Sequence, residues 1–147
     1  MLLCSCVDIL FNMNIEDRVD RMAADLEKFI ELAQMWQLLF DECPLGIVAF
    51  DSNMKFSIIN NAFIEMTGYS NDILGKNISD VLPERFKKMH KKMERQYAKK
   101  PEKKTNRHGL TPYILTVDGR ELLVDIDLSH IKYDGAIYYV AFIRRVL

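Results

Sequence analysis

A regular stripe of apolar residues opens the interpretable part of the chain and predicts a long leading helix. The apolar positions alternate in spacing between four and three residues, which is a heptad pattern. They are Ile15, Val19, Met22, Leu26, Phe29, Ala33, Trp36 and Phe40. Asn14, followed by Glu16 and Asp17, is typical of a capped helix start with acidic residues in its first turn. We therefore predict an amphipathic helix over residues 14–40.

The stripe also predicts what the helix does. It covers about three and a half heptads, enough to suggest a coiled coil with a second copy of the chain. The predicted dimer interface is Val19, Met22, Leu26, Phe29, Ala33 and Trp36. The alternative is that the helix folds onto its own domain. We favour a homodimer, because an uncovered Phe29, Trp36 and Phe40 would leave a large apolar patch on a monomer.

Later in the chain the pattern changes to short strand-like runs separated by turn signals. The runs are residues 46–50, 55–59, 115–117, 122–129 and 136–143. Asp51-Ser52-Asn53 separates the first two, and Asp118-Gly119 and Asp134-Gly135 separate the last three, which predicts hairpins. Residues 122–129 alternate between apolar and polar, as expected of a strand with one covered face. Residues 138–143 are apolar on both faces, so this strand should be central or covered by a helix.

Between the strand-like runs, the segment from Asn60 to His90 contains several helix starts and stops. Asn60 can cap a short helix that Gly68 can end in a left-handed conformation. Ser70 and Gly75 repeat this pattern, and Pro83 suits the first position of a longer helix. We predict a broken chain of small helices.

The motifs of this segment resemble those of a known family. N-x-A-F-x-x-M-T-G-Y-S, I-L-G-K-N-I and V-L-P-E-R-F are similar to the helical half of a PAS domain, the sensory and dimerisation module of many signalling proteins. The flanks G-I-V-A-F-D and Y-Y-V-A-F-I-R-R also fit, so the resemblance covers roughly residues 40–146. It implies an α+β PAS fold, in which a five-stranded antiparallel sheet carries short helices on one face and encloses a cavity. The expected organisation is an apolar extension at residues 1–13, the dimerisation helix at 14–40 and the PAS domain at 41–147.

The helix after Pro83 raises the question of a cofactor. Phe86, His90, Met93 and Tyr97 recur every three or four residues and should share its inner face. The spacing of Pro83, Phe86 and His90 resembles that of haem-bearing oxygen-sensor PAS domains, which implies His90 as the iron ligand if haem binds.

A small organic ligand is another possibility. Its pocket would be lined by Phe63, Met66, Phe86, Met93 and Tyr113. The same residues could instead fill the core, so the cofactor stays open between none and haem.

Composition excludes several other classes. A chain of 147 residues can build one core domain with an appendage, and no apolar run approaches the ~20 residues of a membrane span. Three cysteines and three scattered histidines form no disulfide framework and no metal site. Residues 1–13 lack the basic start and the cleavage site of a secretory signal, so we expect a cytoplasmic protein. We see no nucleophile–base pair and no phosphate-binding loop, so we do not expect an enzyme.

The small net charge of −1 hides an uneven distribution. Residues 85–107 contain 11 basic and 2 acidic residues, whereas residues 1–84 contain 14 acidic and 5 basic ones. The basic block could attract nucleic acid or an acidic partner. Aromatic residues for base stacking do not alternate with the basic ones, so nucleic acid is the less favoured partner, and a solvated helix face is the simplest interpretation.

Together these features predict a sensory or protein-interaction module in signal transduction. It would act as a homodimer, contact an unidentified signalling partner and respond to a small ligand in its cavity. The alternatives are a haem-binding gas or redox sensor that uses His90, and a purely structural dimerisation module without a ligand.

Overall fold

The computed structural model describes residues 13–102, 104–105 and 112–146. Apart from Met13, the predicted apolar extension at residues 1–13 lies outside these ranges. The chain divides into two compact units, of which the first ends at Leu39 and the second begins at Phe40.

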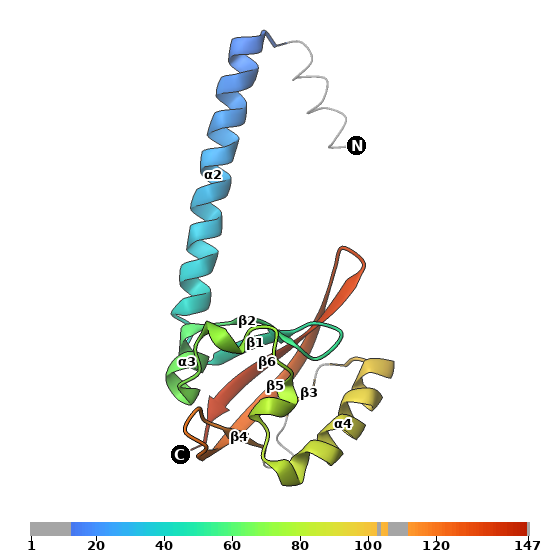
Figure 1. The fold of residues 1–147 in the computed structure, drawn as a ribbon. Helices are drawn as coiled ribbons and strands as arrows, with labels where there is room; N and C mark the ends of the chain where they lie inside the picture. Colours follow the sequence, from blue (N-terminus) through green and yellow to red (C-terminus); the bar gives the residue numbers. More distant parts are fainter. Residues whose placement is uncertain (1–12, 103, 106–111, 147) are drawn as a thin grey trace. The chain divides into compact units, whose positions relative to one another are not determined.

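The leading helix α2 runs over Ile15–Asp41 and starts as its sequence predicts (Figure 1). The Asp17 N–H donates to the side-chain oxygen of Asn14 over 2.8 Å, and the Arg18 N–H donates to the Asn14 carbonyl over 3.1 Å. These bonds satisfy N–H groups that have no partner inside the helix. No residue of α2 is buried, and the apolar stripe is widely exposed, with Phe29 at 68% and Trp36 at 69%.

Beyond α2, the described strands form one antiparallel sheet. They are β1 (Gly46–Phe50), β2 (Phe56–Ile59), β3 (Lys104–Thr105), β4 (Tyr113–Leu115), β5 (Glu121–Tyr133) and β6 (Ala136–Arg145). The order is β2-β1-β6-β5, and the next position is shared by β3 and β4, which pair with different parts of β5. The predicted five-stranded arrangement is confirmed, with the fifth position split between two short strands. The prediction that residues 138–143 form a central strand is also confirmed, because β6 lies between β1 and β5.

The two Asp-Gly turns differ from each other. Asp134 and Gly135 both have positive φ, 48° and 74°, as the predicted hairpin turn requires. At the other turn only Gly119 has positive φ, 81°, and its N–H donates to the Thr116 carbonyl. The preceding strand ends at Leu115 rather than at residue 117, because the Val117 N–H turns away to donate to the Thr67 carbonyl over 2.9 Å.

Four helical segments lie over one face of the sheet (Figure 1). They are α3 (Asn61–Thr67), the 3₁₀ turns η1 (Asn71–Ile73) and η2 (Ile78–Val81), and α4 (Glu84–Lys99). The predicted caps are confirmed: Asn60 accepts from the Phe63 N–H, and Ser70 accepts from the Asp72 N–H. Gly68 ends α3 with φ of 77°, and a Cβ there would lie 2.8 Å from a methyl carbon of Val117.

The core lies between these helices and the sheet. Val48 of β1 and Val124 of β5 are fully buried, and Phe63 of α3 packs against Phe56 with ring centroids 5.9 Å apart. Along β5, Val124 points inward while Asp125 is exposed, which confirms the predicted alternation.

Candidate functional site

A single buried side chain joins the end of the leading helix to the domain. Asn60 is 0% exposed. Its carboxamide oxygen accepts from the N–H groups of Ile47, over 2.8 Å, and Phe63, over 3.2 Å. Its carboxamide nitrogen donates to the carbonyls of Phe40, over 3.0 Å, and Leu45, over 2.9 Å. These four bonds use both donors and two acceptor positions of the amide.

The partners of Asn60 belong to four different segments. Phe40 lies in the last turn of α2, where carbonyls have no partner inside the helix. Leu45 is in the connection after α2, Ile47 is in β1 and Phe63 is in α3. A buried polar network of this kind is stable only when all its members are satisfied, so these segments are coupled at one point. We call Asn60 and its four partners the junction.

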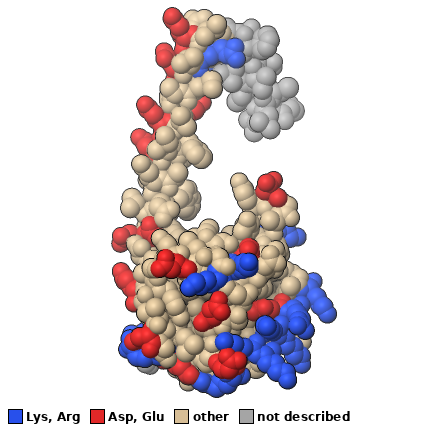
Figure 2. All heavy atoms as spheres, in the orientation of Figure 1, with Lys and Arg blue, Asp and Glu red and all other residues tan. Residues whose placement is uncertain are grey.

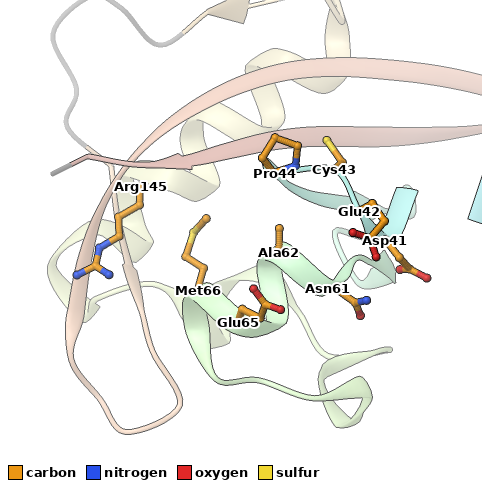
Figure 3. A pocket seen from close by; sticks show the side chains of 9 residues that line it. All are labelled: Asp41, Glu42, Cys43, Pro44, Asn61, Ala62, Glu65, Met66 and Arg145. Carbon is orange, nitrogen blue, oxygen red and sulfur yellow. The ribbon is translucent and has the colours of Figure 1, made fainter. Parts of the chain in front are cut away.

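An open surface pocket of about 410 Å³, called the cavity below, lies where the end of α2, the start of α3 and the end of β6 come together (Figure 3). Its lining residues are Asp41, Glu42, Cys43, Pro44, Asn61, Ala62, Glu65, Met66 and Arg145. Arg145 lies at one end and Asp41 and Glu42 lie at the other (Figure 3). The cavity is therefore next to the junction, at the place where the chain enters and leaves the domain.

The structure distributes the predicted ligand-pocket residues over several settings. Phe63 is in the core, and Met66 lines the cavity beside α2 and also packs on the core. Phe86 and Tyr113 stack on each other with ring centroids 6.0 Å apart and an interplanar angle of 2°. Met93 is 41% exposed. Of these five residues, the structure brings Phe86 and Tyr113 into direct ring contact.

Arg85 fastens the first turn of α4 to the sheet. Its guanidinium lies 4.5 Å from the ring centroid of Phe86 and 5.6 Å from that of Tyr113, and it donates two hydrogen bonds to the carboxylate of Glu121. These hydrogen bonds hold the pKa of Glu121 below its ordinary value and raise that of Arg85. Sequence reasoning missed this contact, because the residues are far apart in the chain and no local motif connects them.

His90 is placed on α4 as predicted, at the boundary of the domain. Its Nδ1 lies 2.6 Å from a carboxylate oxygen of Glu94, a contact that also orients metal-binding imidazoles. On the same helix, however, Phe86 is stacked on Tyr113, and Tyr97 packs on Tyr139 with ring centroids 5.5 Å apart. Burial raises the pKa of Tyr97, and the neighbouring Tyr139 adds to this rise. These two ring pairs lie one turn before and two turns after His90 along α4, so a haem held by His90 would be placed beside them.

No three His, Cys, Asp or Glu side chains in the described ranges gather as a metal ion would require. Of the helices that the structure describes, none combines the length and the apolar character needed to cross a membrane.

Comparison with known proteins identifies the family to which the chain belongs. A family model described as the PAS fold matches residues 34–146, so the chain belongs to the PAS family. A PAS domain of an HTR-like protein from Haloarcula marismortui is similar, with a TM-score of 0.71 and 16% identity; the match covers 84% of this chain and 99% of that one. The search of curated proteins found no match.

Two further solved structures resemble the chain. One is a PAS domain from a two-component sensor histidine kinase, with a TM-score of 0.66 and 19% identity; the match covers 81% of this chain and 99% of that one. The other is the PAS-B domain of Cycle from Drosophila melanogaster, with bound ethylene glycol, at a TM-score of 0.60 and 16% identity; the match covers 69% of this chain and 99% of that one.

Proposed function

We propose that the chain is a sensory and protein-interaction module of a signalling system, which dimerises through α2 and transmits a change in its domain to that helix. Its place in the PAS family supports this role. One similar domain comes from a sensor histidine kinase, and another comes from a nitrogen regulation protein of Vibrio parahaemolyticus. The observation that carries the proposal is the junction, in which the buried Asn60 binds the last turn of α2, the sheet and α3.

The dimer is proposed from the apolar stripe of α2. Val19, Leu26 and Phe29 lie on one face of a 27-residue helix and are all exposed. An exposed stripe with heptad spacing is the pattern by which two helices pack as a coiled coil. A second copy of α2 would cover it, and the acidic residues of the helix would remain in water.

Signal transmission is proposed as a population shift. A ligand or partner that binds one arrangement of α3 and β1 better than another stabilises that arrangement. Because Asn60 bonds to both segments and to the Phe40 carbonyl, the end of α2 must follow them or lose a partly buried hydrogen bond. We place a small ligand in the cavity beside the junction, where Met66 contributes an adaptable apolar side chain.

Sedimentation velocity of the full chain tests the dimer. We expect the wild type to sediment as a dimer and Leu26→Asp to sediment as a monomer, because the aspartate would be placed in the apolar seam. Ala24→Asp is the matched control, since Ala24 is an exposed residue of the same helix outside the seam. A monomeric wild type, or equal behaviour of both variants, would contradict the proposed dimer.

Spin-label distances test transmission. A label on a cysteine introduced at the exposed Lys28, in a background without the native cysteines, reports the separation of the two α2 helices in a dimer. We expect Asn60→Ala to change or broaden this distance distribution, because the variant frees the end of α2 from the domain. Identical distributions in both proteins would show that the junction does not control the helix pair.

Two cheaper measurements separate the alternatives. Native mass spectrometry that finds a retained small molecule supports the sensory role, and a stable dimer that retains none supports a purely structural one. An absorption spectrum with the strong band of haem, lost in His90→Ala, would support the haem alternative against the packing described above. The proposal is for a binding module and assigns no catalytic residue.

A further inference from the structure

The outer face of α4 carries a row of cationic side chains. Lys88, Lys92, Arg95 and Lys99 follow one another at intervals of three or four residues and therefore lie along one line on the helix. All four are exposed, and Figure 2 shows basic side chains gathered over the part of the surface where Figure 1 places α4.

Among the described residues, none of these four forms an ion pair. The ion pairs of α4 involve Arg85, which binds Glu121, and Lys87, which binds Glu84. Like charges one turn apart repel each other, so the row is unfavourable in the isolated helix. It is nevertheless held in place, because the opposite face of α4 is anchored in the core by Tyr97. A fixed row of uncompensated positive charge attracts an anionic partner.

The residues beside the row indicate which kind of anion it suits. Met89 and Met93 are each 41% exposed. Met89 lies three residues before Lys92 and four before Met93, so the two methionines lie on one side of the row, between it and the buried face of α4. Exposed methionines are adaptable apolar contacts for protein partners. A single-stranded nucleic acid would use free aromatic rings to stack its bases, but Phe86 is already stacked on Tyr113 beneath Arg85. A membrane would need a free apolar helix face, and α4 uses its own in the core.

We infer that this surface, which we call the cationic face (Lys88, Lys92, Arg95 and Lys99 with Met89 and Met93), binds an acidic protein segment that carries apolar side chains among its carboxylates. The row covers about 16 Å along the helix axis, at ~1.5 Å per residue. A helix with carboxylates every three or four residues matches this length and spacing. The apolar side chains of the segment would contact Met89 and Met93, and its carboxylates would pair with the lysines and the arginine.

Fluorescence anisotropy with the full chain tests the inference. The probe is a labelled synthetic helical peptide in which Glu recurs every three or four residues with Leu along one edge, at an ionic strength of about 0.15 M. We expect binding that Lys88→Glu/Lys92→Glu weakens at least about tenfold, because like charges then face the peptide. The matched control is Lys55→Glu/Lys132→Glu, which makes the same change in net charge at exposed sites outside α4 and should leave the affinity unchanged.

A second variant tests the apolar part of the surface. Met89→Ser/Met93→Ser keeps every charge and should weaken peptide binding severalfold, including at high salt, where charge pairs are screened. Circular dichroism verifies that each variant is folded. The inference is overturned if single-stranded DNA of equal charge or phosphatidylserine vesicles bind as tightly as the peptide. It is also overturned if the control weakens binding as much as the α4 variant, or if the serine variant binds like the wild type.

Discussion

Asn60→Ala is the substitution that tests the structure most directly. It removes all four side-chain hydrogen bonds of the junction and introduces no new group. The Phe63 N–H loses the acceptor that caps α3, and the Ile47 N–H loses its partner at β1. The carbonyls of Phe40 and Leu45 lose their donors.

The size of the effect follows from burial. A hydrogen bond in a folded protein contributes about 1 kcal/mol net, and a buried group left unpaired costs about 1–3 kcal/mol. Phe40 and Leu45 are only partly buried, so water can replace some of the lost donors there. We therefore expect Asn60→Ala to lower the free energy of unfolding by about 2–4 kcal/mol. For a domain of this size that corresponds to a fall in Tm of about 10–20 °C.

Urea unfolding followed by circular dichroism measures this difference. The midpoint should fall by about 1–2 M with an unchanged m-value, because the surface exposed on unfolding is the same. Asn61→Ala is the matched control: Asn61 is the next residue, is exposed and makes no side-chain hydrogen bond in the described structure. We expect its free energy of unfolding to change by less than about 0.5 kcal/mol.

Asn60→Asp separates the accepting bonds from the donating ones. The aspartate retains the acceptor for Ile47 and Phe63, but turns an oxygen toward the carbonyls of Phe40 and Leu45. We expect it to be at least as unstable as Asn60→Ala, because a buried carboxylate would face two carbonyls. A loss below about 1 kcal/mol for Asn60→Ala, or a stable Asn60→Asp, would refute the hydrogen-bond scheme of the junction.

Two further changes test other parts of the domain. The hydrogen bonds from Arg85 lower the pKa of Glu121 from its ordinary 4.5, so the ionised carboxylate stabilises the fold above that pH. The wild type should therefore be more stable than Glu121→Gln near neutral pH, and this difference should disappear as the pH falls through the lowered pKa. Unfolding curves measured at several pH values test this expectation. Gly68→Ala should lower the free energy of unfolding by at least about 1 kcal/mol more than Gly75→Ala, as measured by thermal unfolding. Both glycines have positive φ, but only the new Cβ at residue 68 would contact Val117. Val117→Ala should reduce that excess, and equal losses for the two alanine variants would contradict the contact.

Much of the fold could be predicted because its signals are local. The starts of α2, α3 and both 3₁₀ turns depend on a side chain that bonds to a backbone N–H two or three residues later, as at Asn14 and Ser70. Only α4 among the described helices begins without such a bond, after Pro83. The hairpin between β5 and β6 depends on two adjacent residues that accept positive φ. Where a distant residue intervenes, the prediction was less accurate: β4 ends earlier than expected because Val117 bonds to Thr67.

The junction could not be predicted, because it is made by contacts across the chain. From the sequence, Asn60 is a helix cap, and that prediction is confirmed. Its bonds to Ile47, Leu45 and Phe40 cross 13, 15 and 20 residues, and no local pattern indicates them. A possible signal was the burial implied by the apolar residues on both sides of Asn60, since a polar residue inside a core needs partners for all its groups.

On α4 the helical spacing predicted the wrong one of two adjacent residues for the inner face. Starting from His90, positions 93 and 94 both lie near the same face, and the apolar methionine is the obvious choice for the interior. The structure instead turns Glu94 inward, where its carboxylate contacts the His90 ring, and leaves Met93 41% exposed. That exchange leaves Met93 at the surface, one helical turn after Met89, rather than in a ligand pocket. The two exposed methionines give the cationic face an apolar side, which is why we expect that face to distinguish a protein partner from other polyanions.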